Sequence, residues 1–270
     1  MRYAFALAAV LCASPALAQQ PTAPAPGSNH DARPQFDIST GVDFERGDFG
    51  TGAQVDKIAI PLTAGVSIGS VRVSAQLPWV RVTAPANVIA PTGPLGLPIL
   101  VDPTRPATRT TRQGLGDLRL GAAYDLPVQG IVASVRAAAK LPTASVDKGL
   151  GTGKADYSVG ADVAKPLGAV TPYAGVTYTM AGDPEGFQLR NSFSGQAGAA
   201  LRLGGSASAQ LGYAYAQNPI EAGEDDQRIV GGLHADVGRS LSLGVYGSGG
   251  LSAGAPRLGG GVTLGLKFGR

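Results

Sequence analysis

Apolar and polar residues alternate one by one along most of this chain, and residues 114–127 (GLGDLRLGAAYDLP) show the pattern most clearly. Successive side chains of a β-strand point to opposite faces. One face of this segment collects the apolar side chains of Leu118, Leu120, Ala122, Tyr124 and Leu126. The other face collects small or charged residues, namely Asp117, Arg119, Gly121, Ala123 and Asp125. The alternation predicts an amphipathic strand.

The same alternation recurs in about 12 segments, and none of them is apolar on both faces. These candidate strands cover residues 36–46, 55–66, 71–82, 114–127, 131–141, 155–165, 170–180, 190–203, 207–216, 227–237, 241–251 and 257–268. Many two-faced strands without helices leave no partner for the apolar faces in a soluble core. The sequence therefore predicts an all-β fold, an antiparallel transmembrane β-barrel of about 12 strands with an apolar outside and a wet inside.

The connections between these segments are alternately short and long. Short turns are expected near residues 69, 128, 168, 204 and 239, and longer polar segments near residues 50, 85–113, 148, 185 and 222. Outer-membrane barrels have short periplasmic turns and longer external loops, so both termini are placed in the periplasm. Residues 85–113 contain six prolines, which exclude a central strand there. We expect this segment to form an external lid or to fold into the barrel mouth.

The first residues have the features of an export signal. Arg2 precedes a short apolar run, and Ala16-Leu17-Ala18 forms an A-x-A cleavage site before Gln19. Cys12, the single cysteine, lies inside this signal, so the mature chain is expected to lack disulfides. The predicted division is a signal peptide over residues 1–18, a flexible Pro- and Ala-rich periplasmic leader over 19–34, and an outer-membrane β-barrel over 35–270.

Composition agrees with this division and excludes one class of partner. The chain contains 40 glycines and only 15% charged residues, which suits tight turns and small lumen-facing positions better than a helical bundle. The net charge of +3 is dispersed, without a basic cluster or an acidic tail. Nucleic acid is therefore not expected as a partner.

Large aromatic residues stand at the ends of the candidate strands, on the face predicted to be outward. Barrels in membranes carry aromatic girdles at both interfaces. We expect such girdles to contain Trp79, Tyr124, Tyr157, Tyr178, Phe193, Tyr215 and Phe268.

Two motifs carry a resemblance to a known family. Leu77-Pro78-Trp79-Val80-Arg81-Val82 is followed by a long variable segment and then by GLGDLRLGAAYDL. This arrangement resembles the outer-membrane β-barrel transporter family named for the meta-pathway of phenol degradation. The resemblance covers most of the mature chain in architecture and implies transport of hydrophobic or aromatic compounds. It is uninformative about the individual solute.

The inward faces carry charges of both signs, and these form the candidate solute path. It comprises Asp117, Arg119, Arg72, Arg136, Lys140, Asp156, Asp162, Arg202, Arg228, His234 and Asp236. One interpretation is a polar path with an electrostatic constriction. The other is a lumen that salt bridges close and rigidify.

Catalytic and metal sites are not expected. His234 is the single histidine of the predicted barrel, and it stands beside Asp236 without a GxSxG elbow elsewhere in the chain. No cluster has metal-ligand spacing, and the acidic residues between Glu221 and Asp226 fit a solvated loop. The sequence thus predicts a protein that is not an enzyme, with no catalytic residues, no metal and no cofactor.

The favoured function is passive uptake of small, hydrophobic or aromatic solutes across the cell outer membrane. The protein is expected to be exported to that membrane by means of the cleaved signal peptide. The alternative is a structural or adhesive barrel with a closed, salt-bridged lumen, and a lipid-acting barrel enzyme is a less favoured third. The expected partners are outer-membrane lipid and lipopolysaccharide, the outer-membrane assembly machinery and the small-molecule solute.

Overall fold

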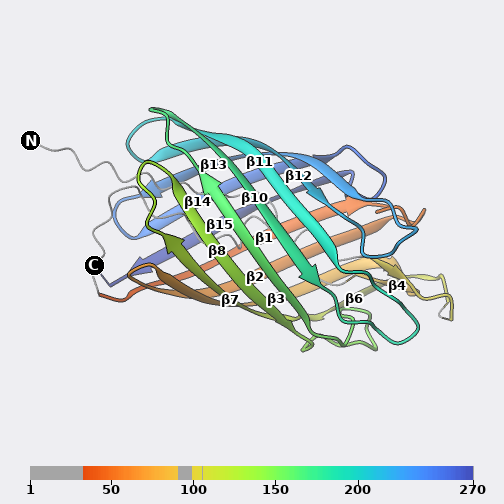
Figure 1. The fold of residues 1–270 in the computed structure, drawn as a ribbon. Coiled ribbons are helices and arrows are strands. Elements are labelled where there is room, and N and C mark those ends of the chain that lie inside the picture. The colour runs from red at the N-terminus through yellow and green to blue at the C-terminus, as the bar shows by residue number, and fades with distance from the viewer. Residues whose placement is uncertain (1–32, 91–98, 105, 270) are drawn as a thin grey trace, which may run out of the picture.

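Antiparallel pairing runs from neighbour to neighbour around the wall of the molecule and returns from the last strand to the first (Figure 1). The computed structural model describes residues 33–90, 99–104 and 106–269. Its strands are β1 (Gln35–Gly47), β2 (Val55–Ile68), β3 (Val71–Pro85), β4 (Val88–Ile89), β5 (Leu100–Val101), β6 (Arg109–Leu115), β7 (Leu118–Leu126), β8 (Val132–Leu141), β9 (Asp156–Ala164), β10 (Val170–Met180), β11 (Ser192–Arg202), β12 (Ala207–Ala216), β13 (Asp226–Val237), β14 (Leu241–Gly250) and β15 (Leu258–Phe268).

The first and last strands close the barrel. β1 pairs with β15 from Phe36 opposite Phe268 to Arg46 opposite Leu258, and on its other side β1 pairs with β2. β6 and β7 together make one span, because both pair with β3. The wall is therefore a closed antiparallel barrel of 12 strands. This confirms the predicted fold class.

The two ends of the barrel differ. The start of β1 and the end of β15 lie side by side at one end of the barrel (Figure 1), which we call the terminal end. The short connections at this end include Gly69–Ser70 and 238–240, and Gly69 and Gly238 adopt left-handed φ values of 58° and 68° that favour glycine. The opposite end, called the loop end, carries the longer connections over residues 48–54, 86–108, 142–155, 181–191, 217–225 and 251–257.

The segment 85–113 differs from its prediction. β3 continues to Pro85. The next wall strand, β6, begins at Arg109 and pairs with the loop-end part of β3, from Trp79 to Pro85. The prediction that no strand lies in 85–113 is therefore wrong for Pro85 and for residues 109–113. All six prolines of the segment precede Arg109, so β6 contains no proline. Within the segment, β4 and β5 form a separate small sheet.

Each wall strand has one face toward the interior and one toward the outside, as the alternation of exposed and less exposed residues shows along β1. Apolar side chains such as Ile38, Leu62, Val159 and Leu211 are exposed on the outward face. Residues 1–32, which contain the predicted signal peptide and most of the predicted leader, lie outside the described residues. Among the described residues, no helix is long and apolar enough to cross a bilayer.

Candidate solute path in the barrel interior

The predicted path residues do not gather into one site. They form separate groups along the barrel interior, and most of the charges in each group are paired with the opposite sign. Two groups lie near the loop end and three lie nearer the middle or the terminal end. Arg202, which ends β11, donates from Nη2 to the carbonyl of Gly168 in a terminal-end turn, at 2.8 Å.

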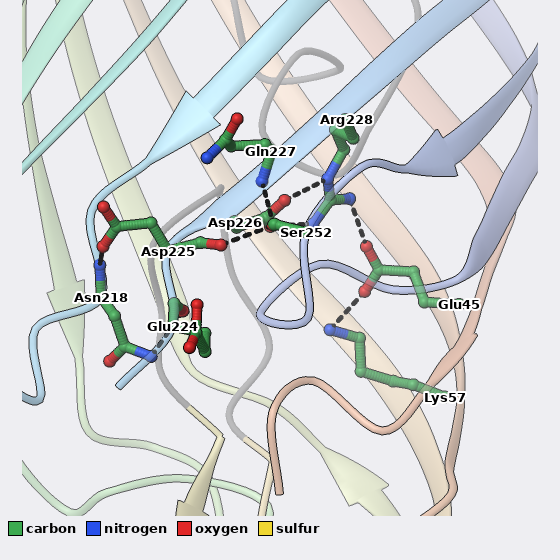
Figure 2. A network of polar contacts seen from close by, with 9 residues as sticks. All are labelled: Glu45, Lys57, Asn218, Glu224, Asp225, Asp226, Gln227, Arg228 and Ser252. Carbon is green, nitrogen blue, oxygen red and sulfur yellow. Dashed lines mark hydrogen bonds and ion pairs between the residues drawn. The ribbon is translucent and has the colours of Figure 1, made fainter. Parts of the chain in front are cut away.

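The first group, which we call the Glu45 network, links three strands across the interior (Figure 2). Arg228 of β13 pairs with Glu45 of β1 at 2.9 Å, and Lys57 of β2 pairs with the other Glu45 oxygen at 2.7 Å. Asp226 receives two hydrogen bonds from the same guanidinium, from Nε at 2.9 Å and from Nη2. The arginine and both acids are almost fully removed from solvent. This network corrects the sequence expectation for Asp226, which was placed in a solvated loop.

The second group, the Asp117 network, lies beneath the loop over residues 142–155. Lys140 of β8 pairs with Asp156 of β9 at 2.8 Å and with Asp117 at 3.3 Å. Asp117, at the break between β6 and β7, is fully buried and also accepts the backbone N–H of Ala144 at 3.0 Å. Arg119 lies opposite Lys140 in the strand register and interacts electrostatically with Asp117 and Asp156. Two acids thus face two bases, and all four side chains are buried.

Three smaller groups lie closer to the terminal end, two of them ion pairs and one a set of three residues. A bidentate pair joins Arg72 of β3 to Asp125 of β7, with distances of 2.7 and 3.0 Å. Arg136 binds Asp162 and also donates to the Thr177 hydroxyl at 2.6 Å. The remaining group places the His234 Nε2 and the Lys267 Nζ each 3.5 Å from Asp236.

Inward glycines provide the space for these long side chains. A Cβ atom on Gly65 would come within 2.5 Å of the Asp37 carboxylate, and one on Gly121 within 2.9 Å of the Ser74 hydroxyl. The same holds for Gly261, where a Cβ would meet Asp43 at 2.6 Å and the Tyr246 ring at 2.7 Å. The high glycine content is therefore a property of the lumen wall as well as of the turns.

Sequence reasoning missed an apolar cluster inside the loop end, which we call the mouth cluster. It consists of the buried residues Val55, Val80, Val82, Ala84, Val88, Ala90, Ala144 and Leu150. The wall contributes Val55 from β2 and Val80, Val82 and Ala84 from β3, all at inward positions. The signal was present, because beyond Trp79 the inward positions of β3 become apolar while Arg81 and Thr83 turn outward. The alternation thus continues beyond Trp79, but the apolar residues there face inward and the polar residues face outward.

Hydrogen bonds hold the two covering loops to each other and to the wall. Arg112 of β6 donates to the carbonyl of Val88 at 2.8 Å, and the N–H of Ala90 donates to the carbonyl of Gly149 at 3.2 Å. The N–H of Leu118 donates to the Thr143 hydroxyl at 2.8 Å. In its described part, the segment after β3 folds into the mouth, one of the two arrangements expected from the sequence.

Two inward tyrosines were also absent from the prediction. Tyr246 of β14 donates to Asp43 of β1 at 2.6 Å, across the glycine-rich β15. Tyr173 of β10 places its hydroxyl over Gly198 and Gly212 of the next two strands. The alternation along each strand shows that these tyrosines face inward, unlike the aromatic residues of the girdles. It does not show which residues of other strands they contact.

The predicted girdle residues occupy outward positions in the wall. Tyr157, Tyr178, Phe193 and Tyr215 lie near the loop ends of their strands, and the rings of Tyr178 and Phe193 are 4.8 Å apart. Trp79 lies just on the loop-end side of the middle of β3. Near the terminal end, Tyr124 is exposed and Phe268 pairs with Phe36 across the closing seam. Their contact with a membrane interface stays a prediction.

Of the acidic residues in the loop over 217–225, Asp225 is bound within the protein, whereas Glu221 and Glu224 are exposed as expected. Asp225 accepts the hydroxyl of Tyr215 at 2.7 Å and the N–H of Asn218 at 2.8 Å. Among residues 33–90, 99–104 and 106–269, no three His, Cys, Asp or Glu side chains come together as a metal site would require. The described interior therefore offers paired charges and, under the loops, the buried apolar mouth cluster.

Comparison with known proteins gives the fold and a family. A family model described as "Putative MetA-pathway of phenol degradation" matches residues 22–268. An outer membrane channel from Pseudomonas putida F1 aligns with a TM-score of 0.64 at 12% identity, covering 89% of this chain and 99% of that one. The translocator domain of the autotransporter NalP from Neisseria meningitidis aligns with a TM-score of 0.53 at 14% identity, covering 90% of each chain. No curated protein sequence matches the chain.

Proposed function

The chain belongs to the MetA-pathway of phenol degradation family, and on this premise we propose that it is an outer-membrane channel for passive uptake of small, hydrophobic or aromatic solutes. The fold is that of outer-membrane barrels. A fold shared by a channel and by an autotransporter translocator does not choose between functions. The choice rests on the interior.

The mouth cluster carries the proposal. Val80 and Val82 face the interior and have no exposed surface, because Val88 and Leu150 of two loops cover them. These valines pack the loops, and they also place apolar side chains on the inner wall, where a lumen for polar solutes alone would be expected to carry polar ones. When the covering loops move aside, the wall valines present an apolar surface that an aromatic ring can occupy in their place. Exchange of one apolar contact for another makes such displacement inexpensive.

One observation favours the alternative of a closed structural barrel. The Glu45 network crosses the interior from β13 to β2 through Arg228 and Lys57. Breaking such a buried pair leaves an uncompensated charge, so the network resists opening. The two functions differ in what the mouth does when its apolar packing is disturbed.

Replacing Val82 tests the choice. Val82→Asp buries an unpaired carboxylate under the loops, which we expect to displace them. Ion conductance in planar bilayers should then rise, while uptake of a radiolabelled monocyclic aromatic compound by cells should fall relative to wild type. Val82→Ile keeps the surface apolar and is the matched control, with uptake close to wild type.

Three results would contradict the channel. Aromatic uptake that is equal in Val82→Asp and Val82→Ile would show that the mouth cluster is not on the path. Uptake of a neutral sugar that follows aromatic uptake in every variant would remove the preference for apolar solutes. A wild-type and a Val82→Asp protein that both fail to conduct would favour the closed barrel.

Location and processing complete the proposal. We infer that residues 1–18 are removed as a signal peptide, that the barrel inserts with its terminal end in the periplasm, and that the outer-membrane assembly machinery inserts it. Outward apolar residues and the aromatic residues near both barrel ends support this placement. Detergent extraction from outer-membrane fractions, with a heat-dependent shift in gel mobility, tests it.

A further inference from the structure

Charged residues on the outward face of the barrel are confined to one patch. In the described wall strands, the outward positions carry four charges, namely Arg46, Asp56, Arg81 and Arg109. We call these four residues the rim patch. They come from β1, β2, β3 and β6, which are consecutive in the wall. All four lie toward the loop end, and the outward positions at the terminal end are uncharged.

The strand register brings the rim patch together. Arg46 lies opposite Asp56, Asp56 lies opposite Thr83 of β3, and Thr83 lies opposite Thr111 of β6. Arg81 is the next outward-facing residue from Thr83 toward the terminal end, and Arg109 is the next outward-facing residue from Thr111 toward the loop end. Each such step along a strand measures about 6.8 Å. The patch thus spans neighbouring strands just beyond Trp79, which is itself one step from Arg81.

Asp56 holds two of the arginines in place. Its two carboxylate oxygens accept from Nε of Arg46 and from Nη2 of Arg109, each at 2.6 Å. The Arg46 side chain remains 64% exposed and the Arg109 side chain 44% exposed, so both keep guanidinium surface for another anion. Arg81 is exposed and forms no ion pair within the described part of the chain. One acid and three bases leave the patch with a charge of +2.

We propose that the rim patch binds a phosphate group of lipopolysaccharide in the outer leaflet. An arginine facing lipid costs about 2–4 kcal/mol at the bilayer midplane and about 0–1 kcal/mol near an interface, so three arginines together mark an interface. Guanidinium groups bind phosphate oxygens through paired N–H donors. Phosphorylated glycolipid on one side of the membrane alone explains why the charges occupy one end alone.

A second copy of the barrel does not fit the patch. The outward face of the described strands contains no acid except Asp56, which is already bound by two arginines. Two copies joined through their rim patches would therefore bring like charges together. The inference rests on the outer-membrane placement proposed above but not on the solute, because lipid binding is measured without transport.

Binding of purified lipid A in nonionic detergent tests the site. The test variant is Arg46→Gln with Arg81→Gln and Arg109→Gln, and the matched control is Arg33→Gln with Lys165→Gln and Arg239→Gln. The control removes the same three charges from exposed positions at the terminal end. We expect the test variant to bind bisphosphorylated lipid A about tenfold more weakly than wild type, and the control to bind within about twofold.

Each of the following outcomes overturns the proposal. Dephosphorylated lipid A that binds wild type as tightly as the phosphorylated form excludes a phosphate site. Equal weakening in both triple variants shows a non-specific effect of net charge. Phosphatidylglycerol that competes as well as lipid A shows a general site for acidic lipids. If the triple variant loses its heat-dependent gel shift, Arg81→Gln alone is used. It removes no ion pair, and wild-type affinity in this variant overturns the three-arginine site.

Discussion

Arg228 and Glu45 form an ion pair at 2.9 Å although β14 and β15 separate their strands in the barrel wall. The contact is possible because the positions between them are small. Gly259 lies opposite Glu45, and Ser248 lies opposite Gly259. The arginine therefore passes over the inner surface of two strands that contribute almost no side-chain volume there. Cross-lumen pairing and the glycine-rich wall are two parts of one arrangement.

Glu45→Ala should destabilise the barrel strongly. The change removes the carboxylate that pairs with Lys57 and leaves Arg228 with Asp226 alone, and loss of one member of a buried pair costs about 3–5 kcal/mol. Urea unfolding in lipid vesicles, followed by the fluorescence of Trp79, the single tryptophan, measures this. Asp56→Ala is the control on the partly exposed rim, where we expect about 1 kcal/mol or less. Equal losses would contradict a buried, coupled network.

Asp117→Ala should loosen the loop over residues 142–155. The substitution removes the acceptor for the Ala144 N–H and one of the two acids that pair with Lys140. Lys148 is exposed in this loop, so trypsin cleavage there should become faster by about tenfold or more.

Asp183→Ala is the matched control for that experiment. Asp183 accepts the Leu189 N–H at 2.8 Å within a different loop. Its removal should leave cleavage at Lys148 at the wild-type rate. Cleavage at Lys148 that accelerates in both variants would indicate a general loss of barrel stability, against the local role assigned to Asp117.

Gly261→Ala should impair folding where a neighbouring glycine change does not. The new methyl group would lie 2.6 Å from both the Asp43 carboxylate and the Val42 carbonyl, one of which is backbone. Overpacking of this kind costs about 1–3 kcal/mol or more. Gly249→Ala on β14 meets no atom within 4 Å and should be neutral. The folded fraction after refolding, read from the gel-mobility shift, should separate them.

Exchanging the charges of Arg72 and Asp125 should restore part of what either single change removes. The two groups form a bidentate pair between β3 and β7. Arg72→Asp alone places two acids together, and Asp125→Arg alone places two bases together. We expect a coupling free energy of about 1–3 kcal/mol in a double-mutant cycle of unfolding. Additive single effects would show that the pair contributes geometry without energetic coupling.

The sequence by itself determined the closed barrel, the face on which each residue lies and the strand positions outside the segment 85–113. These follow from a period of two and from the absence of any other partner for the apolar faces. It also marked the charges of the lumen, including Asp117, Lys140 and Arg228. Period and polarity are local properties, so residues close in sequence suffice to reveal them.

Tertiary structure alone decided which charges meet and which loops cover the apolar inward positions. Glu45 and Arg228 stand 183 residues apart in sequence, and their contact depends on strand closure and on the small residues between them. Val82 became a mouth residue because two loops pack over it, a choice that alternation within β3 does not encode. Contacts across the lumen depend on the closed barrel as a whole. The register of each strand and the space left by its glycines set the distance between side chains that are far apart in sequence.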